Sequence, residues 1–411
     1  MSAHSLTLPA RTATAGPGRM SAPLMLLFAA AAGVISVTLF AAQPLIGLIG
    51  PSLGLRGAWG GAGSTLTLLG YAAGLVVLVP LTDVMENRTL ILRTLAACVA
   101  ALGAAALARS AAMFLAASFA IGLTACAIQM LIPIAAALSG PAERGRVVGT
   151  IGSGLMLGIL LSRPAATLLA ETAGWRAVYA ASAALVAVLA LLLGMALPRR
   201  QPPPGPDYPA VIRSLAALWR DEKVLRASSI SSALCFTALS LFWSVVALRL
   251  ATPPFSLGAN GIALFAFAGA GGAISAPIAG RLGDRGFTRA ASLAFRCMVA
   301  GASLLAALAG SGLIGAHLPG LLPTVLMTLA AFIIDAGTIG EQTLSRRAIT
   351  LLRPEAVGRM NGLFTGLFFI GGSAGSLLAA VAWGQGGWLL ACALGTGFGV
   401  ASLLVSAFIR I

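Results

Sequence analysis

Twelve long apolar stretches run through this 411-residue chain, and each is long enough to cross a lipid bilayer as a helix. Crossing the hydrocarbon core takes about 20 apolar residues, since a helix rises about 1.5 Å per residue. Within a bilayer every backbone N–H and C=O group needs a partner from the protein, which a helix supplies. The pattern therefore predicts an all-α membrane protein. The predicted spans are residues 22–49, 58–80, 90–108, 111–138, 147–171, 177–197, 227–250, 258–280, 287–310, 320–345, 357–382 and 386–409.

The composition favours the same class of protein. Apolar residues make up 59% of the chain and charged residues only 9%, with a mean hydropathy of +0.98. Soluble domains carry roughly 25% charged residues. The net charge of +15 would suit a nucleic-acid-binding protein, but the basic residues stand in short loops between apolar runs and form no continuous patch. We therefore expect the protein to lie in a lipid bilayer and to bind no nucleic acid.

The longest polar stretch, residues 198–226, divides six spans from six. It predicts a cytoplasmic tail at 1–21, an N-terminal six-helix bundle at 22–197, a cytoplasmic linker at 198–226 and a C-terminal six-helix bundle at 227–411. With the N-terminus inside, cytoplasmic segments hold 21 Arg or Lys residues and outer loops hold four. That bias follows the positive-inside rule. We expect both termini to be cytoplasmic and the membrane to be the inner membrane of a bacterium.

The two halves of the chain resemble each other. Residues 141–149 read PAERGRVVG, and residues 354–362, which lie 213 positions later, read PEAVGRMNG. The same offset pairs further identical residues: Gly158 with Gly371, Gly174 with Gly387, Trp175 with Trp388 and Gln129 with Gln342. Identities in one ungapped register indicate an internal repeat. Because each half has an even number of spans, both halves enter the membrane with the same polarity, as in transporters that rock two bundles about a central site.

Two loops carry a family signature. Residues 280–289, after the eighth span, read GRLGDRGFTR, which closely resembles the cytoplasmic signature G-x-x-x-D-R/K-x-G-x-R/K of the major facilitator superfamily. Residues 79–88, after the second span, read VPLTDVMENR and keep only the aspartate and the last arginine. The resemblance covers nearly the whole chain. Two further short motifs resemble those of the drug and metabolite efflux branch: Gln43-Pro44 and Gly174-Trp175-Arg176. The arginine that many such exporters carry in span 4 is missing near Ala116-Ala117-Ser118.

The resemblance implies two six-helix bundles, alternating access and a central cavity lined mainly by spans 1, 4, 7 and 10. It also implies that the signature loop of each half meets the fifth helix of the other half. Asp83 is therefore expected near Arg359, and Asp284 near Arg146. The alternative is that these charges serve only membrane topology. The candidate cytoplasmic gate comprises Asp83, Arg88, Arg146, Asp284, Arg285, Arg289 and Arg359.

Small residues recur at a spacing of four in spans 5 and 11. They are Gly145, Gly149, Ser153, Gly154, Gly158 and Ser162 in span 5, and Gly358, Gly362, Gly366, Gly371 and Gly375 in span 11. Such faces let helices approach closely in lipid. They predict that these helix faces form the seam between the two halves, which opens and closes during transport. Tight helix packing explains the same pattern equally well.

Polar residues inside the spans are the candidate cavity residues, because burying charge in a bilayer is costly. Thr328, Asp335 and Gln342 are seven positions apart in span 10 and share one helix face. A carboxyl group in an apolar span binds a proton more readily than in water, so Asp335 is a candidate proton carrier; a static ion pair is the alternative. Arg163, in span 5 beside Pro164, would either neutralise Asp335 or hold an anionic substrate.

Other candidates surround these two. They are the cavity-facing amides of Gln43 and Gln129, the aromatic side chains of Phe236, Phe242 and Trp243, and Glu341, which lies near Arg346 and Arg347. The aromatic residues would either stack on an amphipathic substrate or pack as ordinary core. Glu341 is expected to serve as a gate or a helix cap.

The sequence contains no motif for ATP hydrolysis, and residues 60–65, GGAGST, lack the lysine of a P-loop. We therefore expect no cofactor, no metal and no enzymatic activity. The predicted function is proton-coupled efflux of a small drug-like molecule or metabolite by a monomeric secondary transporter. The alternatives of the same fold are uptake, or export of a sugar, nucleoside or amino acid. A sensor or an intramembrane enzyme is the alternative from another class.

Overall fold

The computed structural model describes residues 20–55, 59, 61–140, 143–201, 207–312, 321–353 and 356–408, with side chains to residue 405. All regular secondary structure in these ranges is helical. The predicted tail at 1–21 lies outside the described residues except for Met20 and Ser21, and so do the prolines that begin the repeated motif, Pro141 and Pro354.

The helices follow the predicted spans closely. They are α1 (Ala22–Phe40), η1 (Gln43–Leu45), α2 (Ile46–Ser52), α3 (Ala62–Val77), η3 (Val79–Asp83), α4 (Asn87–Ala106), α5 (Ala111–Ala125), α6 (Ala127–Leu138), α7 (Arg144–Ala173), α8 (Trp175–Ala196), α9 (Tyr208–Asp221), α10 (Lys223–Leu250), α11 (Ala259–Phe265), η4 (Ala266–Gly269), α12 (Ala270–Asp284), α13 (Thr288–Gly310), α14 (Leu321–Thr350) and α15 (Val357–Phe408).

Eleven helical stretches of the described chain are long and apolar enough to cross a membrane. The last of them, Val357–Val405, has 49 residues, about twice what one crossing needs. Gly387 breaks it with φ 61° and ψ −147°, so it accounts for two crossings. The break between these two crossings thus lies at Gly387, close to the predicted boundary between spans ending at 382 and starting at 386. Gly174, its partner in the repeat, likewise has φ 81° between α7 and α8, a backbone conformation that glycine adopts without strain.

Three predicted spans contain a break that the sequence pattern did not indicate. Span 1 is interrupted at η1, span 4 at Cys126, between α5 and α6, and span 8 at η4. Proline, at Pro44, accounts for the first break, since it has no backbone N–H to donate. Broken helices at membrane depth are tolerated where protein surrounds them, and Gln43 and Leu45 of η1 are buried.

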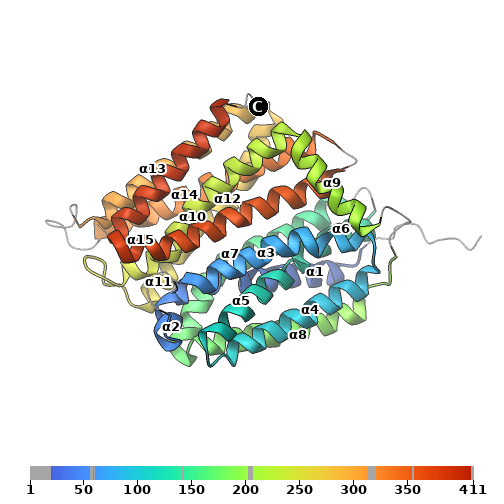
Figure 1. The fold of residues 1–411 in the computed structure, drawn as a ribbon, viewed down its shortest axis with the longest axis horizontal. Helices are drawn as coiled ribbons and strands as arrows, with labels where there is room; N and C mark the ends of the chain where they lie inside the picture. Colours follow the sequence, from blue (N-terminus) through green and yellow to red (C-terminus); the bar gives the residue numbers. More distant parts are fainter. Residues whose placement is uncertain are drawn as a thin grey trace, which may run out of the picture.

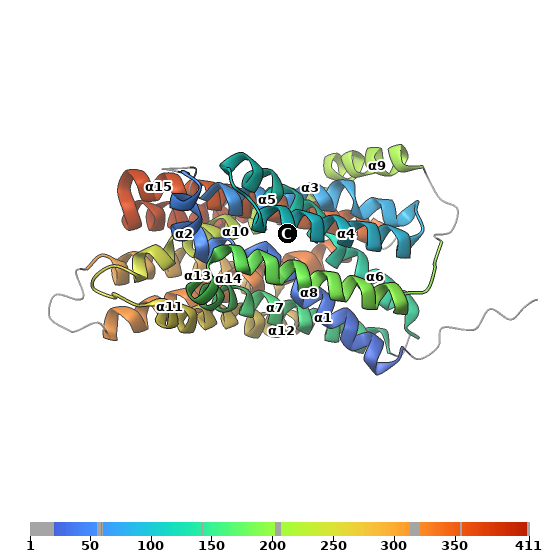
Figure 2. The same ribbon diagram turned by 90° about the horizontal axis from the view of Figure 1, so that it is seen from below.

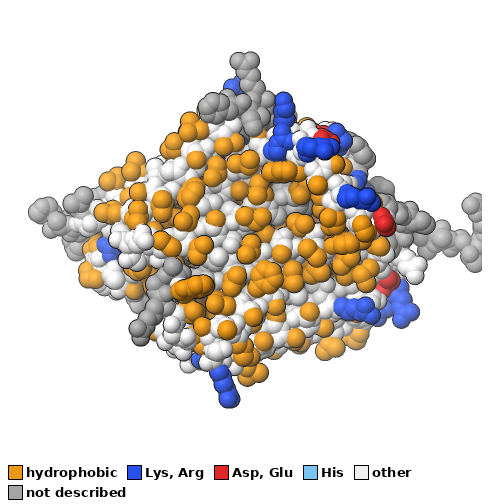
Figure 3. All heavy atoms as spheres, in the orientation of Figure 1, with side chains coloured by type: hydrophobic (Ala, Val, Ile, Leu, Met, Phe, Trp, Pro, Cys, Tyr) orange, Lys and Arg blue, Asp and Glu red, His pale blue; other side chains and the backbone are white. Residues whose placement is uncertain are grey.

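Helices α1–α8 gather in one part of the molecule and α10–α15 in another (Figure 1). The two groups meet where α3 packs on α15 and where α7 packs on α11 and η4. Figure 2 shows the long helices running roughly along the same axis, with α9 at one end of it. Lys and Arg side chains gather near that end, while the visible flank is largely hydrophobic (Figure 3). We call the end where α9 meets the last residues of α3 the basic end, and the opposite one the far end.

The segment predicted as a linker contains α9, which touches both helix groups. The Tyr208 hydroxyl donates to the Val77 carbonyl at 2.9 Å, and Arg359 of α15 donates to the Ser214 hydroxyl at 2.8 Å. Leu218 packs in a small apolar cluster that includes residues of α10 and α15. Helix α9 is therefore a bridge between the two helix groups at the basic end.

The small residues of α7 and α15 have two different surroundings. A Cβ atom at Gly158 would collide with the carbonyl oxygen of Gly33 in α1, and one at Gly371 would collide with that of Ala233 in α10. These contacts join helices of the same group, so for them the seam prediction is wrong and the packing interpretation holds. Glycines on another face have open space around them, as at Gly149, or lie against the other group. Gly366 of α15 faces Val76 of α3 in this way, which fits the predicted seam.

Glu86 explains why the first signature loop departs from its pattern. Its carboxylate accepts the backbone N–H groups of Arg88 and Thr89, both at 2.8 Å, and so caps the N-terminus of α4. It also accepts the N–H of Arg200, at 3.2 Å, which ties the loop to the chain after α8. The Arg88 guanidinium donates to the carbonyl of Gly194 in α8. Arg88 thus fastens two helices of its own group in this conformation, and its place in the gate stays a prediction.

Glu86→Ala is expected to lower the stability of the protein by about 0.5–2 kcal/mol, the usual loss for an N-cap. Burial acts to raise the pKa of Glu86, but its hydrogen bonds outweigh burial and lower the pKa to about 2. Because this lies below the ordinary value of 4.5, the charge-dependent stabilisation is complete above about pH 4.5 and is lost as the pH falls towards 2.

The measurement is thermal unfolding of detergent-solubilised protein, followed by the intrinsic fluorescence of its six tryptophan residues. The difference between wild type and variant should shrink from pH 7 to pH 3. Glu171→Ala, which removes an exposed glutamate near the end of α7, is the matched control. Equal losses in both variants would rule out the capping role.

Candidate functional site

A cavity of about 130 Å³ lies between the two helix groups. Its lining comes from spans 1, 2, 4, 5, 7, 8, 10 and 11, so the predicted set of four spans is incomplete. Span 5 contributes as many lining residues as any other span. Most of the wall is apolar, and the polar groups in it are few: Ser36, Tyr71, Gln129, Arg163, Asp335, Gln342, Arg346 and Thr365.

Four of the predicted residues form one buried cluster beside this cavity. The Trp243 indole N–H donates to Asp335 Oδ2 at 2.7 Å. The Arg163 guanidinium carbon lies 4.2 Å from the centroid of the same indole ring. Arg163 also donates to Gln43 Oε1, from Nε at 3.3 Å and from Nη2 at 3.2 Å. Spans 1, 5, 7 and 10 thus bring together residues that lie as far apart as 43 and 335 in the chain.

The cluster holds one positive and one negative side chain, and Trp243 touches both. All of its members are buried, with Arg163 and Asp335 each 6% exposed. An arginine over an indole face is attracted by the ring quadrupole, and more strongly where water is excluded. With Asp335 ionised the cluster is neutral, and with Asp335 protonated it carries one positive charge. A single proton therefore changes the electrostatics of the whole cavity.

Aromatic rings form part of the apolar wall of the same cavity. Phe236 stacks on Phe368 with ring centroids 4.1 Å apart and planes 4° from parallel. Tyr71 lies against Phe369 at 4.4 Å, and Gln129 Nε2 donates to the Tyr71 hydroxyl at 3.2 Å. Phe236 and Gln129 were expected here. The other three rings were not, because an aromatic residue in an apolar helix gives no signal of which way it faces.

Arg346 also lines the cavity, although the sequence suggested a position beside Glu341. Its Nε is buried and finds no hydrogen-bond partner within the described parts of the chain. A signal existed, since Arg346 follows Asp335 by eleven residues, close to three turns of helix, and so shares its face. Gln342, predicted on the same face, lines the cavity as expected.

Glu341 does not line this cavity, and that prediction is wrong. It is fully buried between α10, α13 and α14, where Arg296 pairs with it at 3.0 Å. The Ser232 and Ser345 hydroxyls donate to it at 2.5 and 2.7 Å. The reason is geometric: neighbouring residues on a helix point about 100° apart, so Glu341 and Gln342 face different surroundings.

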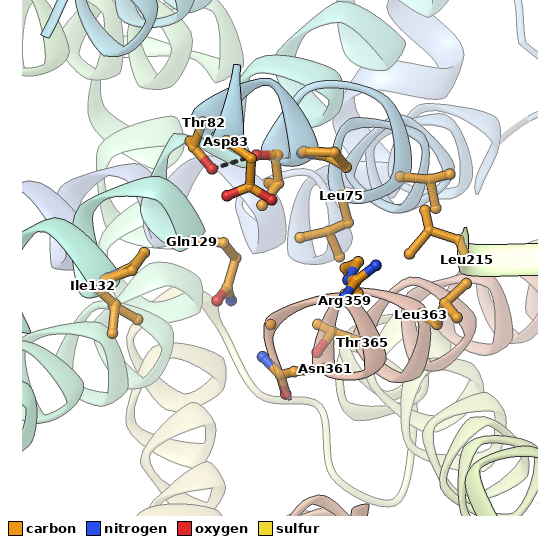
Figure 4. Close-up of a pocket in the computed structure, with 16 residues that line it drawn as sticks. Leu75, Thr82, Asp83, Gln129, Ile132, Leu215, Arg359, Asn361, Leu363 and Thr365 are labelled. Carbon is orange, nitrogen blue, oxygen red and sulfur yellow. Dashed lines mark hydrogen bonds between the residues drawn. The ribbon is translucent and has the colours of Figure 1, made fainter. Parts of the chain in front are cut away.

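The central cavity continues towards the basic end on two sides. One extension, of about 330 Å³, shares Gln129 and Thr365 with it, and its wall holds Asp83 and Arg359 (Figure 4). The other, of about 430 Å³, shares Gln342 with it. The two helix groups are therefore separated at the basic end.

The predicted gate contacts are not formed in this open arrangement. Asp83 and Arg359 face the same cavity, and no ion pair joins them within the part of the chain described here; Arg359 bonds Ser214 instead. Asp284 pairs with Arg347 of its own group at 3.0 Å, so its predicted pairing with the other group is wrong for this conformation.

The remaining gate candidates likewise form no hydrogen bond or ion pair with the other half among the described residues. Arg146 pairs with Glu143 at 3.4 Å. Arg285 is exposed on the loop after α12, and Arg289 lines a separate pocket in the C-terminal group. Where the basic end is open, the gate charges that form ion pairs, Arg146 and Asp284, take partners of their own group.

The far end is closed. The Ser64 and Ser376 hydroxyl oxygens lie 2.5 Å apart, and the Ser373 hydroxyl donates to the Thr65 carbonyl at 2.9 Å. These bonds join the first turn of α3 to α15, and so join the two helix groups. The cavity is thus reached from one end of the molecule and sealed at the other.

Comparison with known proteins identifies relatives of the chain. A family model described as "Major Facilitator Superfamily" matches residues 24–376. "Uncharacterized transporter YgaY" of Escherichia coli O157:H7 is 35% identical over 386 residues, which cover 94% of this chain and 95% of that protein.

Two solved structures resemble the fold. A point mutant of the nucleoside transporter NupG gives a TM-score of 0.68 at 15% identity, covering 94% of this chain and 100% of that one. A bacterial homologue of the human lysosomal transporter Spinster, inward-facing and unoccupied, gives a TM-score of 0.67 at 14% identity, covering 95% and 96%. At these identities the likeness concerns the fold alone.

Proposed function

Since this chain belongs to the major facilitator superfamily and is a multi-pass membrane transporter, we propose that it exports a small amphipathic molecule in exchange for protons. We place the basic end at the cytoplasm, in a bacterial inner membrane, because its excess of arginine fits the positive-inside rule. The bundles at 22–197 and 227–411 would then rock about the cavity within a monomer. On closure of the basic end, Asp83 and Arg359 would come together.

The observation that carries the proposal is the buried carboxylate of Asp335 in a cavity open at one end. When ionised, Asp335 accepts hydrogen bonds and offers a negative charge to a substrate that stacks on Phe236 and its neighbours. When protonated, it loses that charge. Substrate and proton therefore compete for one group, which is the requirement for exchange. A ligand that binds the two states unequally shifts the equilibrium between them.

A second candidate, uptake of an organic anion together with a proton, is favoured by one observation. Arg346 and Arg163 give the cavity two positive side chains against one negative. Protonation of Asp335 would leave both arginines unbalanced and ready to bind a carboxylate. In that case proton and substrate bind together, and the protein works as a cotransporter.

Arg346→Gln is expected to weaken binding of a carboxylate ligand about tenfold, the effect of losing one charge-assisted hydrogen bond. The probes are naphthalene derivatives that carry a carboxylate, an amide or an ammonium group on the same ring system. Binding to purified protein is measured by titration calorimetry. Arg353→Gln is the control, since Arg353 lies outside the cavity and its two extensions and pairs with Glu222 at 2.6 Å.

The member of the series that binds best separates the two candidates. Preference for the ammonium or amide compound supports exchange, and preference for the carboxylate supports cotransport. If Arg346→Gln and Arg353→Gln had the same effect, Arg346 would have no role in the cavity.

The function itself is tested by a growth screen of cells that express the protein against many toxic compounds. Export predicts tolerance to the transported compound, and uptake predicts greater sensitivity. Reconstituted protein that moves none of the compounds under an imposed pH gradient would argue against proton coupling.

A further inference from the structure

A separate pocket of about 500 Å³ lies inside the C-terminal helix group, where α10, α13, α14 and the end of α15 meet. It shares no lining residue with the central cavity. Its polar lining consists of hydroxyl and guanidinium groups and contains no carboxylate: Ser228, Thr288, Arg289, Ser292, Arg296 and Ser345. Every charged residue in this wall is therefore positive.

Two buried groups of the pocket lack partners. Arg296 is 3% exposed, and its Nη2 pairs with Glu341, but its Nε makes no hydrogen bond to any described residue. The hydroxyl of Ser228, a residue 1% exposed, is also unpaired there. Buried polar groups without partners are rare because they lose the hydrogen bonds that water would give. Both point to a ligand that accepts hydrogen bonds.

The electrostatics select the sign of that ligand. Arg289 stands in the first turn of α13, and neither a hydrogen bond nor an ion pair to another described residue is found for it. The helix N-terminus adds the partial positive charge of its free N–H groups. The charge of Glu341, behind the pocket wall, is already balanced by Arg296. The unbalanced charge is positive and the free groups are donors, which suits a phosphate with its several acceptor oxygens.

Apolar side chains continue from the pocket along the outside of the protein. Leu293 lines the pocket and is 51% exposed, and Leu304 and Leu308 are 54% and 47% exposed further along the same helix. Exposed leucines on a membrane span face lipid chains. Basic pockets between membrane helices suit phospholipid headgroups. A phosphate in the pocket can therefore belong to a lipid whose acyl chains lie along α13.

We propose that this pocket binds the phosphate group of an anionic phospholipid, held by Arg289, Arg296 and Ser228 at the end of α13. The site is independent of the central cavity and of what the protein transports. A bound headgroup would join α10, α13 and α14 at the basic end.

The test uses the purified full-length protein in detergent, titrated with phosphatidylglycerol, phosphatidylcholine or inorganic phosphate and followed by native mass spectrometry. Arg289→Gln is expected to weaken phosphatidylglycerol binding about tenfold, as for one lost charge-assisted hydrogen bond. Arg281→Gln, which removes another exposed arginine at the same end but outside the pocket, should change it less than about twofold. Arg296→Lys keeps the charge beside Glu341, loses Nε and should give an intermediate loss.

Each outcome decides the proposal. Selective binding of phosphatidylglycerol that depends on Arg289 supports the lipid site. Inorganic phosphate binding with the same dependence, and without the lipid, supports the phosphate site and overturns its lipid source. Equal losses in the Arg289 and Arg281 variants, or equal binding of both lipids, would overturn the site, because they show only general attraction to surface charge.

Discussion

Asp335→Asn is expected to abolish proton-driven transport, reducing it to less than about a hundredth of the wild-type rate, since proton exchange by a positioned side chain contributes on the order of 100-fold or more. Asparagine has nearly the same shape and can still accept the Trp243 N–H that Asp335 now accepts at 2.7 Å. It cannot bind or release a proton, so the charge of the cluster with Arg163 is fixed. The protein should fold and bind substrate but lose its response to a pH gradient.

The measurement is flux into proteoliposomes with and without a pH gradient, using the compound found by the growth screen. Asp221→Asn provides the control, because Asp221 is exposed and Arg220, at 3.1 Å, is its one ion-pair partner among the described residues. That variant should transport normally. Wild-type flux and gradient dependence in Asp335→Asn would exclude Asp335 as the proton carrier and leave it a structural role.

Joining the far end covalently is the second change with a large expected effect. In the double variant Ser64→Cys/Ser376→Cys, the two sulfur atoms replace hydroxyl oxygens that lie 2.5 Å apart. A disulfide there would keep α3 on α15 and prevent the far end from opening. Under alternating access both ends must open in turn, so oxidation should reduce transport to background, and a reductant should restore it.

The background for this experiment is Cys297→Ser, since Cys297 is the exposed one among the five native cysteines. Each single cysteine variant should transport under oxidising conditions. Full transport by the cross-linked protein would show that the far end does not need to open there, and would contradict rocking of the two bundles about this contact.

Membrane spans were the most predictable part of this molecule. Each predicted span is helical, and α5 and α13 begin within one residue of the predicted start. The reason is that the bilayer imposes the same local requirement on every span, a run of apolar residues with its backbone bonds satisfied internally. Hydropathy reports that requirement directly. It carries no information on breaks such as η4, where the sequence holds no proline to mark them.

The candidate site was predictable where burial of charge gave the signal. Asp335 and Arg163 stand out in apolar spans, and they lie in the same cluster. The prediction for Glu341 was wrong and Arg346 was missed for the same reason. Both residues were judged by their position along the span, and not by the direction in which their side chains point around the helix axis. Both lie near the same end of α14, but one turns into a helix group and the other into the cavity.

The sequence by itself determined the class of the protein, its helices, its internal repeat and the intramembrane charges, because these follow from local hydropathy and from identities in one register. The tertiary structure decided which partner each charge takes. Asp284 pairs with Arg347 and Asp83 stands apart from Arg359, because the basic end is open and the two groups are separated there. A moving contact exists in one conformation and not in another, so a sequence can supply its residues but only a structure shows when they meet.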